Sequence, residues 1–281
     1  MFNRVLYPTD FSEVSLHALR ECIPRLAKLE IKELHLLNVV DITMAEFEAF
    51  ELESVYRKKL ERLAREVEEE CGGKTRIKAD VRIGIPSIEI AKAAEEAGAE
   101  LIVIPSVGEN IWRRMFVGST ASNLVRAAKK PVLLIKYTER DGKFEFSGDC
   151  ERMFERPLVA LDFSRCSVKL VQTVRKFRER VKGGILIHSV DYGGVDELEH
   201  NMAVAKKNLE KSTKGLGEMF EIEVMVGTAS QAIIGTSLAK NSTLIVLGKK
   251  GRSFIKDLLL GSTAERVIRD SRLPVLLVPC E

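Results

Sequence analysis

Short apolar runs alternate with longer amphipathic stretches along the whole chain. In the first half the apolar runs predict strands, at residues 4–8, 33–39, 76–83, 101–104 and 132–135. Helical patterns fill the sequence between them, at 12–29, 45–70, 87–97 and 119–129. Nearly continuous apolar strands separated by helices indicate a parallel sheet that is covered on both faces. Pro24 falls inside the first helical stretch and should kink or shorten that helix.

The second half of the chain repeats this order of elements and much of its sequence. VLYPTDFSEVSLHAL, which starts at Val5, matches PLVALDFSRCSVKLV, which starts at Pro157. VGSTASNLVRAAKKPVLLI (117–135) matches LGSTAERVIRDSRLPVLLV (260–278) in the same order. A repeat of this length indicates two whole domains in tandem and not a solenoid of short units.

The repeat defines the domain boundaries. We predict domains at 1–138 and 156–281, with the charged, Gly-punctuated stretch 139–155 as their connector. The second copy is the shorter one, and we expect the missing residues to come from the helix that corresponds to 44–70. Each domain is predicted to be of the α/β class, with an open, twisted, five-stranded parallel sheet and helices on both faces.

Composition and charge describe a soluble, globular protein. Hydrophobic residues make up 45% of the chain, and 44 basic residues nearly balance 41 acidic ones, for a net charge of +3. This balance gives little electrostatic support for nucleic-acid binding. The chain has no apolar run near the roughly 20 residues that span a bilayer, and its start lacks the features of a secretory signal. We therefore expect a cytoplasmic protein without nucleic-acid or membrane partners.

Cysteine and histidine indicate no catalytic or metal centre. The cysteines are far apart, form no CxxC pair and are expected to be reduced and structural: Cys22, Cys71, Cys150, Cys166 and Cys280. The histidines are expected to be ordinary core or surface residues: His17, His35, His188 and His200. Ser12 and Ser164 each follow an Asp-Phe pair and are expected to cap helices. Because no nucleophile–base–orienter set is recognisable, we predict no catalytic residue, and an enzyme is the less favoured interpretation.

The stretch GKKGRSFIKDLLLGSTAERV in the second domain is the strongest candidate for a ligand site. Gly248 ends a predicted strand and Gly251 supplies a turn. Gly261 and Ser262 begin the last helix, where free amides and the helix dipole favour an anion. Taken alone, the stretch fits a plain turn before a capped helix equally well. Asp162 follows the first strand of the same domain and is therefore expected at the same edge of the sheet as the glycines. This shared position favours the interpretation as a phosphate-binding loop.

This spacing, Gly-x2-Gly-x9-Gly-Ser with an aspartate after the first strand, resembles the universal stress protein family over nearly the whole chain. The resemblance implies a Rossmann-like fold that binds ATP or AMP, with Mg²⁺ as a candidate companion of ATP. It assigns Asp162 to the ribose and the backbone of Val190 to adenine. The implied phosphate loop consists of Gly248, Gly251, Gly261, Ser262 and Thr263. The matching positions of the first domain are Asp10, Val40, Gly108, Gly118 and Ser119.

The two copies depart from the family pattern in different ways. Pro105 stands in the first domain where the second has Gly248, and proline offers no N–H and fixes φ. Glu109 replaces Arg252, which puts a negative charge beside the expected phosphates. We therefore expect the second domain to bind nucleotide better than the first.

The last predicted strand of each domain, PVLLI (131–135) and PVLLV (274–278), is apolar throughout. An exposed apolar edge strand invites pairing. Members of the resembled family commonly dimerise through this strand, so the resemblance implies an intrachain pseudo-dimer and a homodimer as a further assembly.

Three functions remain open at this point. The favoured one is a nucleotide-binding sensor or regulator linked to stress. The second is a slow ATPase or phosphotransferase that uses Lys249, Lys250 and Arg252 with a divalent metal. The third is an interaction scaffold that needs no nucleotide and whose glycine loop is purely structural.

Overall fold

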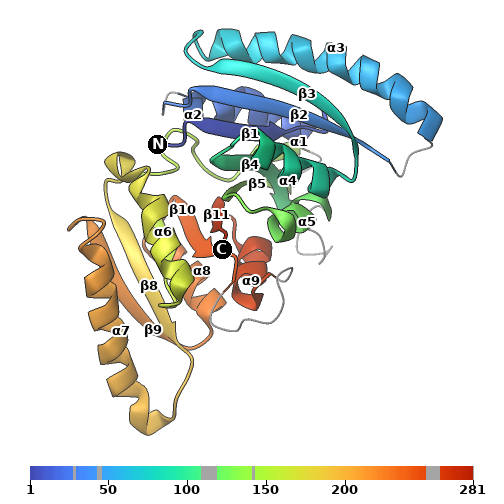
Figure 1. Cartoon of the computed structure of the whole chain (residues 1–281). Coiled ribbons are helices and arrows are strands. Elements are labelled where there is room, and N and C mark those ends of the chain that lie inside the picture. The colour runs from blue at the N-terminus through green and yellow to red at the C-terminus, as the bar shows by residue number, and fades with distance from the viewer. Residues whose placement is uncertain (28–29, 43–45, 109–118, 141–142, 251–259, 281) are drawn as a thin grey trace. The chain divides into compact units, whose positions relative to one another are not determined.

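The chain folds into two compact units, Met1–Phe146 and Ser147–Glu281, in the computed structural model (Figure 1). The structure describes residues 1–27, 30–42, 46–108, 119–140, 143–250 and 260–280. Each unit carries five parallel strands with helices on both faces, as the sequence pattern predicts.

The first unit is built on six strands, β1 (Arg4–Pro8), β2 (Glu33–Asp41), β3 (Arg76–Gly84), β4 (Leu101–Gly108), β5 (Val132–Arg140) and β6 (Lys143–Phe146). The parallel strands pair in the order β3-β2-β1-β4-β5. β6 turns back antiparallel to β5, and it lies in the stretch that was expected to be a connector. The helical elements are α1 (Glu13–His17), the π-helical segment η1 (Ala18–Cys22), α2 (Ile23–Ala27), α3 (Glu46–Glu70), α4 (Pro86–Glu96) and α5 (Ser119–Ala127). Figure 1 shows α3 and α4 on opposite faces of β2 and β3.

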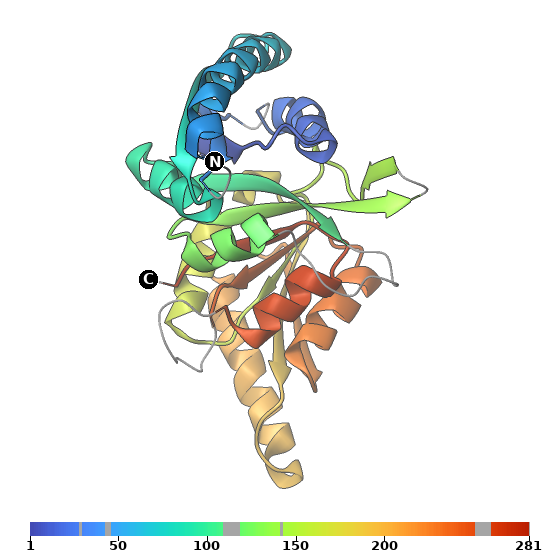
Figure 2. The same cartoon turned by 90° about the vertical axis from the view of Figure 1, so that its right-hand side faces the viewer.

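The second unit repeats this plan with β7 (Pro157–Ala160), β8 (Gly184–Val190), β9 (Phe220–Val226), β10 (Leu244–Gly248) and β11 (Val275–Val278). Their order is β9-β8-β7-β10-β11. The helices are α6 (Arg165–Arg175), α7 (Leu198–Thr213), α8 (Ala229–Ala239) and α9 (Ser262–Asp270), with short 3-10 turns η2 (Arg178–Arg180) and η3 (Val195–Glu197). α8 packs on β7 and β8 beside α9, as Figure 2 shows, whereas α6 and α7 cover the other face.

Burial follows the place of each strand in its sheet. Every residue of β8 and β11 is buried, because helices cover these strands on both sides. The outer strands β3 and β9 keep many exposed or half-buried positions instead. The continuous apolar runs of the sequence therefore correspond to strands that are buried on both faces.

The two copies differ most in the helix that follows their second strand. α3 has 25 residues and its counterpart α7 has 16. This confirms that the second copy is shortened across the helix that corresponds to residues 44–70. Among the described residues, no helix combines the length and the apolar character that a membrane span requires.

Pro24 changes the first helix without ending it. The main-chain amide of Ile23 donates to the carbonyl of Ala18, five residues earlier, so that a π-helical turn precedes the proline. Proline has no N–H and its ring collides with the carbonyl four residues earlier in a regular α-helix. The wider π-turn accommodates the ring, and α2 continues to Ala27.

Candidate functional site

A cavity of 340 Å³ lies at the carboxyl ends of the parallel strands of the second unit. This volume falls within the usual range for small-molecule sites. Its lining comes from segments that are far apart in the sequence and includes Asp162, Gly248, Gly261, Ser262 and Thr263. Gly251 lies outside the described residues. The predicted ribose and phosphate positions of the second unit, apart from that glycine, therefore share one cavity.

A tight turn after β7 holds the carboxylate of Asp162. Its Oδ1 atom accepts hydrogen bonds from the amide of Ser164 (3.0 Å), the hydroxyl of Ser164 (2.6 Å) and the hydroxyl of Ser167 (3.1 Å). Phe163 has a φ of 61°, a left-handed conformation that is uncommon for a bulky residue. Such strain persists only where the surrounding structure holds it, and here it directs the chain from the strand into α6.

The first unit contains the same turn at Asp10, Phe11 and Ser12. Oδ1 of Asp10 accepts from the amide of Ser12 (2.9 Å), and Phe11 has a φ of 61°. Ser12 caps α1 by accepting from the amide of Ser15, as Ser164 caps α6 by accepting from the amide of Cys166. The prediction that both serines are helix caps is confirmed. The Asp-Phe-Ser motif thus encodes one strained turn twice.

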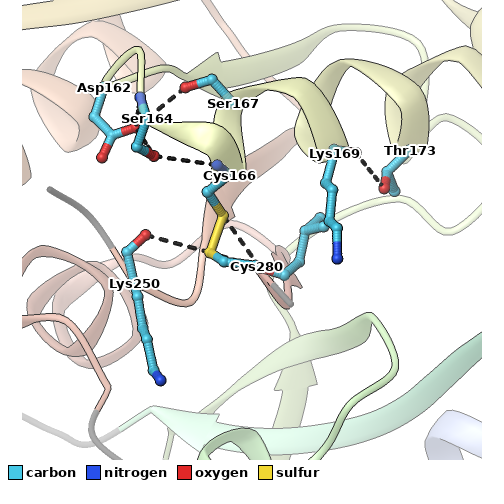
Figure 3. Close-up of a disulfide and its surroundings, with 9 residues drawn as sticks. Asp162, Ser164, Cys166, Ser167, Lys169, Thr173, Lys250 and Cys280 are labelled. Carbon is cyan, nitrogen blue, oxygen red and sulfur yellow. Dashed lines mark hydrogen bonds between the residues drawn. A yellow bond between two sulfur atoms is a disulfide. The ribbon is translucent and has the colours of Figure 1, made fainter. Parts of the chain in front are cut away.

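A disulfide between Cys166 and Cys280 borders the cavity and corrects the expectation of reduced cysteines. Cys166 is the second residue of α6, and Cys280 follows β11, 114 residues later. Figure 3 shows that the disulfide lies between the first turn of α6 and the main chain of Lys250. The carbonyl oxygen of Lys250 is 3.5 Å from the sulfur of Cys280. The pairing was not predictable from spacing, because the order of the strands brings the two residues together. Among the described residues Cys71 is a free thiol.

Gly248 is required by close packing. A Cβ atom at this position would lie 2.6 Å from the sulfur of Cys166 and 3.1 Å from the carbonyl oxygen of Lys250. Real Cβ atoms do not approach other heavy atoms to the first of these distances. A side chain here would therefore displace either the disulfide or the start of the glycine loop.

The two ends of the glycine loop are hydrogen-bonded to each other. The amide of Lys249 donates to the carbonyl of Val278 (2.9 Å), and the amide of Gly261 donates to the carbonyl of Lys249 (2.9 Å). Gly261 is the N-cap residue of α9, so the first-turn amides of that helix begin beside the end of β10. Ser262 and Thr263 belong to this first turn and line the cavity.

Val190 does not line the cavity, whereas its neighbour Ser189 does. Val190 is buried, and its carbonyl accepts a hydrogen bond from the amide of Gly227 at 3.0 Å, on the β9 side of β8. Main-chain groups of successive residues in a strand point to opposite sides, so those of Ser189 point toward β7. β7 ends at Ala160, and the cavity lies beyond it. The main-chain groups at this edge of the cavity are therefore those of Ser189.

The rings of His188 and Tyr192 line one side of the cavity, and Phe163 packs behind them. The imidazole of His188 packs on Phe163, with ring centroids 4.4 Å apart, and meets Tyr192 edge-on. Its Nδ1 atom lies 2.7 Å from the carbonyl oxygen of Leu161, which can only accept, so Nδ1 carries the proton. Nε2 is then the acceptor for the hydroxyl of Tyr192 at 3.4 Å. His188 is buried in this arrangement.

The first unit presents the corresponding residues differently. Asp10 and Ser119 are exposed, and Val40 is buried in β2. β4 continues through Pro105, which pairs with Ile135, and ends at Gly108. The matching strand of the second unit already ends at Gly248. Gly118 lies outside the described residues.

Comparison with known proteins identifies the chain. A sequence model of the universal stress protein family matches residues 1–136 and again residues 153–279. The chain belongs to the universal stress protein family. Its sequence is 30% identical to universal stress protein MJ0577 of Methanocaldococcus jannaschii over 159 residues, which cover 48% of this chain and 96% of that protein. A universal stress protein of Mycolicibacterium smegmatis is 24% identical over 229 residues, or 76% of this chain and 74% of that one.

Solved structures support the same fold for both halves of this universal stress protein. The crystal structure of a universal stress protein from Archaeoglobus fulgidus DSM 4304 superposes with a TM-score of 0.75. The alignment covers 99% of this chain and 96% of that chain at 23% identity. The two chains therefore share the tandem arrangement of the fold.

The sequence reasoning on this universal stress protein missed three features of the cavity. It did not pair the two cysteines, it took Val190 where Ser189 lines the cavity, and it did not place His188, which is a core residue as expected, at the cavity. One signal was available for the last of these. LLNVVD and LIHSVD place Asn38 and His188, both side-chain N–H donors, at the same position of a mostly apolar strand.

Proposed function

We propose that the second unit binds an adenine nucleotide, ATP or AMP, in the 340 Å³ cavity and that the protein acts as a stress-linked sensor or regulator. One observation carries the proposal. An aspartate after the first strand, a glycine after the fourth and the first turn of the last helix meet at a single cavity. These are the three kinds of group that a nucleotide requires of such a sheet edge: an acceptor for the ribose, room for close approach of the phosphates, and amides for their charge.

Each part of the nucleotide has a partner in this proposal. The phosphates lie at the N-terminus of α9, where the amides of Ser262 and Thr263 and the helix dipole favour negative charge. The dipole contributes about 0.3–1 kcal/mol, and charge-assisted hydrogen bonds add to it. Asp162 accepts hydrogen bonds from the ribose hydroxyls. Ser189 replaces Val190 as the residue whose main chain contacts the base. Mg²⁺ is a candidate companion of ATP.

Calorimetric titration of the full chain with ATP, ADP and AMP tests the proposal. Gly261→Asp is the sharpest variant because Gly261 has φ −65° and ψ 143°, which any residue adopts, and because aspartate is a favoured N-cap. The substitution therefore keeps the helix while it places a negative charge beside the phosphates. Gly261→Asn is the neutral control of nearly the same shape. We expect binding in the Asn variant and its loss in the Asp variant; equal binding in both contradicts the proposed phosphate site.

We further propose that the second unit binds nucleotide better than the first. Support comes from Gly248, which ends its strand at the cavity, whereas the first unit continues its strand through Pro105. The matched variants are Asp162→Ala and Asp10→Ala. We expect the first to weaken binding by about tenfold or more, as loss of a charged hydrogen-bond partner does, and the second to have little effect. The opposite result reverses the ranking.

The same protein preparations distinguish binding from turnover. Phosphate release from ATP that exceeds the release by a Ser262→Ala, Asp162→Ala double variant supports the slow ATPase instead. If no nucleotide gives a heat signal and Gly261→Asp changes nothing, the nucleotide-independent scaffold is the better account.

The apolar last strand of each domain supports a proposal on assembly. We infer from the sequence that these strands mediate docking of the two domains and association of further chains. Leu133→Lys and Leu276→Lys place a charge in each strand. A sedimentation profile and a proteolysis pattern that neither substitution changes contradict this proposal.

A further inference from the structure

A side chain replaces a main-chain hydrogen bond where β7 and β8 reach the cavity. The amide of Leu161 donates to the carbonyl of Ile187 at 2.9 Å, so the ladder between the two strands extends one residue beyond β7. The next bond of a parallel ladder would run from the amide of Ser189 to the carbonyl of Leu161. That carbonyl instead accepts from Nδ1 of His188, at 2.7 Å.

The first unit makes the same substitution with a different side chain. The amide of Thr9 donates to the carbonyl of Leu37 at 2.8 Å, which corresponds to the bond from Leu161. The carbonyl of Thr9 then accepts from Nδ2 of Asn38, also at 2.8 Å. Asn38 and His188 are both buried, and both present an N–H group to the carbonyl that follows the first strand. Two different residues thus provide the same donor at the same place.

The replacement of a main-chain donor by the imidazole determines which hydrogen bonds the main chain of Ser189 can make. With the carbonyl of Leu161 occupied by the imidazole, the amide of Ser189 is released from the ladder on the β7 side. Ser189 lines the cavity at this point. The next residue, Val190, has its carbonyl on the opposite side of the strand, where it accepts a hydrogen bond from the amide of Gly227. An N–H and a C=O of one residue, side by side at a cavity edge, match N1 and the amino group of adenine. They oppose guanine, which has a donor at N1 and an acceptor at O6.

We propose that His188 is a positioning residue for nucleobase selection: its Nδ1–H group caps the carbonyl of Leu161 and so frees the main chain of Ser189 to select adenine over guanine. The inference rests on the proposed nucleotide function. Phe163 packs on the imidazole and Tyr192 lies 3.4 Å from its Nε2 atom, so both sides of the ring are held in this orientation. His188 itself acts through Ser189 and not by contact with the base.

His188→Asn and His188→Leu form the test pair. Asparagine reproduces the arrangement of the first unit, whereas leucine fills similar space without a donor. For the full chain with an intact Asp10, we expect His188→Asn to keep the ATP affinity within about threefold and the preference for ATP over GTP. We expect His188→Leu to lose about tenfold or more in ATP affinity, with little change for GTP, because a mismatched polar edge is what discriminates the bases. Equal loss for ATP and GTP, or loss in both variants, overturns the role in base selection.

Amide hydrogen exchange, followed by NMR, tests the inference without relying on affinity. In the nucleotide-free wild type we expect the amide of Ser189 to exchange much faster than that of Ile187, and AMP should slow it. In His188→Leu the Ser189 amide should become protected without nucleotide, because it regains the carbonyl of Leu161. A Ser189 amide that is already protected in the nucleotide-free wild type overturns the inference, whether or not the leucine variant folds.

The two proposals fail in different ways. If the wild type binds no adenine nucleotide, the proposed function is wrong, yet fast exchange at Ser189 would still support the opened strand. If the wild type binds ATP and GTP equally well while Gly261→Asp abolishes both, the site stands and base selection by Ser189 is wrong. Inorganic tripolyphosphate serves as a probe of the phosphate subsite that carries no base, and its binding to His188→Leu should equal that of the wild type.

Discussion

Removal of the Cys166–Cys280 disulfide should destabilise the second unit selectively. The bond joins the first turn of α6 to Cys280, two residues after the end of β11, so it encloses β8, β9, β10 and β11 in one covalent loop. With a sequence separation of 114, the chain-entropy relation gives about 4.8 kcal/mol of stabilisation at 25 °C. Native disulfides of this kind contribute about 2–5 kcal/mol when measured, so the calculated value is close to an upper limit.

Native-state hydrogen exchange of the full chain measures this effect for each unit separately. The perturbed protein is the Cys166→Ser/Cys280→Ser double variant, and Cys71→Ser is the matched control because Cys71 is a free thiol. The slowest amides of β8 and β10 should exchange roughly 30-fold to 3,000-fold faster in the double variant, which corresponds to about 2–4.8 kcal/mol. Amides of β1 and β2 in the same sample provide the reference and should not change.

Two results would refute this reasoning. If β8 and β10 in the double variant exchange as they do in Cys71→Ser, the bond does not constrain the unfolded second unit. If β1 and β2 accelerate as much as β8 and β10, the two units do not unfold independently, and the loop-closure argument applies to the wrong cooperative unit.

Three further predictions follow from single contacts. Gly248→Ala should cost about 1–3 kcal/mol of stability in the second unit, because its Cβ would meet the Cys166 sulfur. Gly235→Ala, on the exposed side of α8, is the control and should be neutral or stabilising. A denaturant titration monitored by hydrogen exchange compares the two variants. Ser164→Ala should cost about 1–2 kcal/mol by the same assay, since it removes the α6 cap and a donor to Asp162, and Ser54→Ala on exposed α3 is its control. The Lys78 ammonium, 2.9 Å from Glu33, lowers the pKa of that carboxyl below its ordinary 4.5. The ion pair between Lys78 and Glu33 should therefore stabilise the first unit above about pH 4.5. This stabilisation should disappear as the pH falls through the lowered pKa that Glu33 has in the folded protein. Glu33→Gln should therefore destabilise the first unit at pH 7 and have little effect at pH 2; an equal cost at both values contradicts the assignment.

Helix and strand positions were largely predictable because they depend on short-range patterns. The apolar runs gave the parallel strands, and the duplication located the same elements twice. Ser12 and Ser164 could be assigned as caps from the residues beside them. Pro24 was expected to disturb its helix, but the solution, a π-turn that lets the helix continue, depends on how the preceding turn packs. β6 was missed because its four residues pair antiparallel with a strand that the pattern had ended too early.

The sequence alone determined the two domains, their sheet class and the groups that reach one edge of the second sheet, because a motif and its spacing are local properties of the chain. Only the tertiary structure decided which of these groups share a cavity and how they are held there. Cys166 and Cys280 meet because of the order of the strands, and Gly248 must be a glycine because their bond packs against it. Ser189 and not Val190 faces the cavity because successive residues of a strand point their groups in opposite directions, so that a one-residue shift in alignment reverses the assignment.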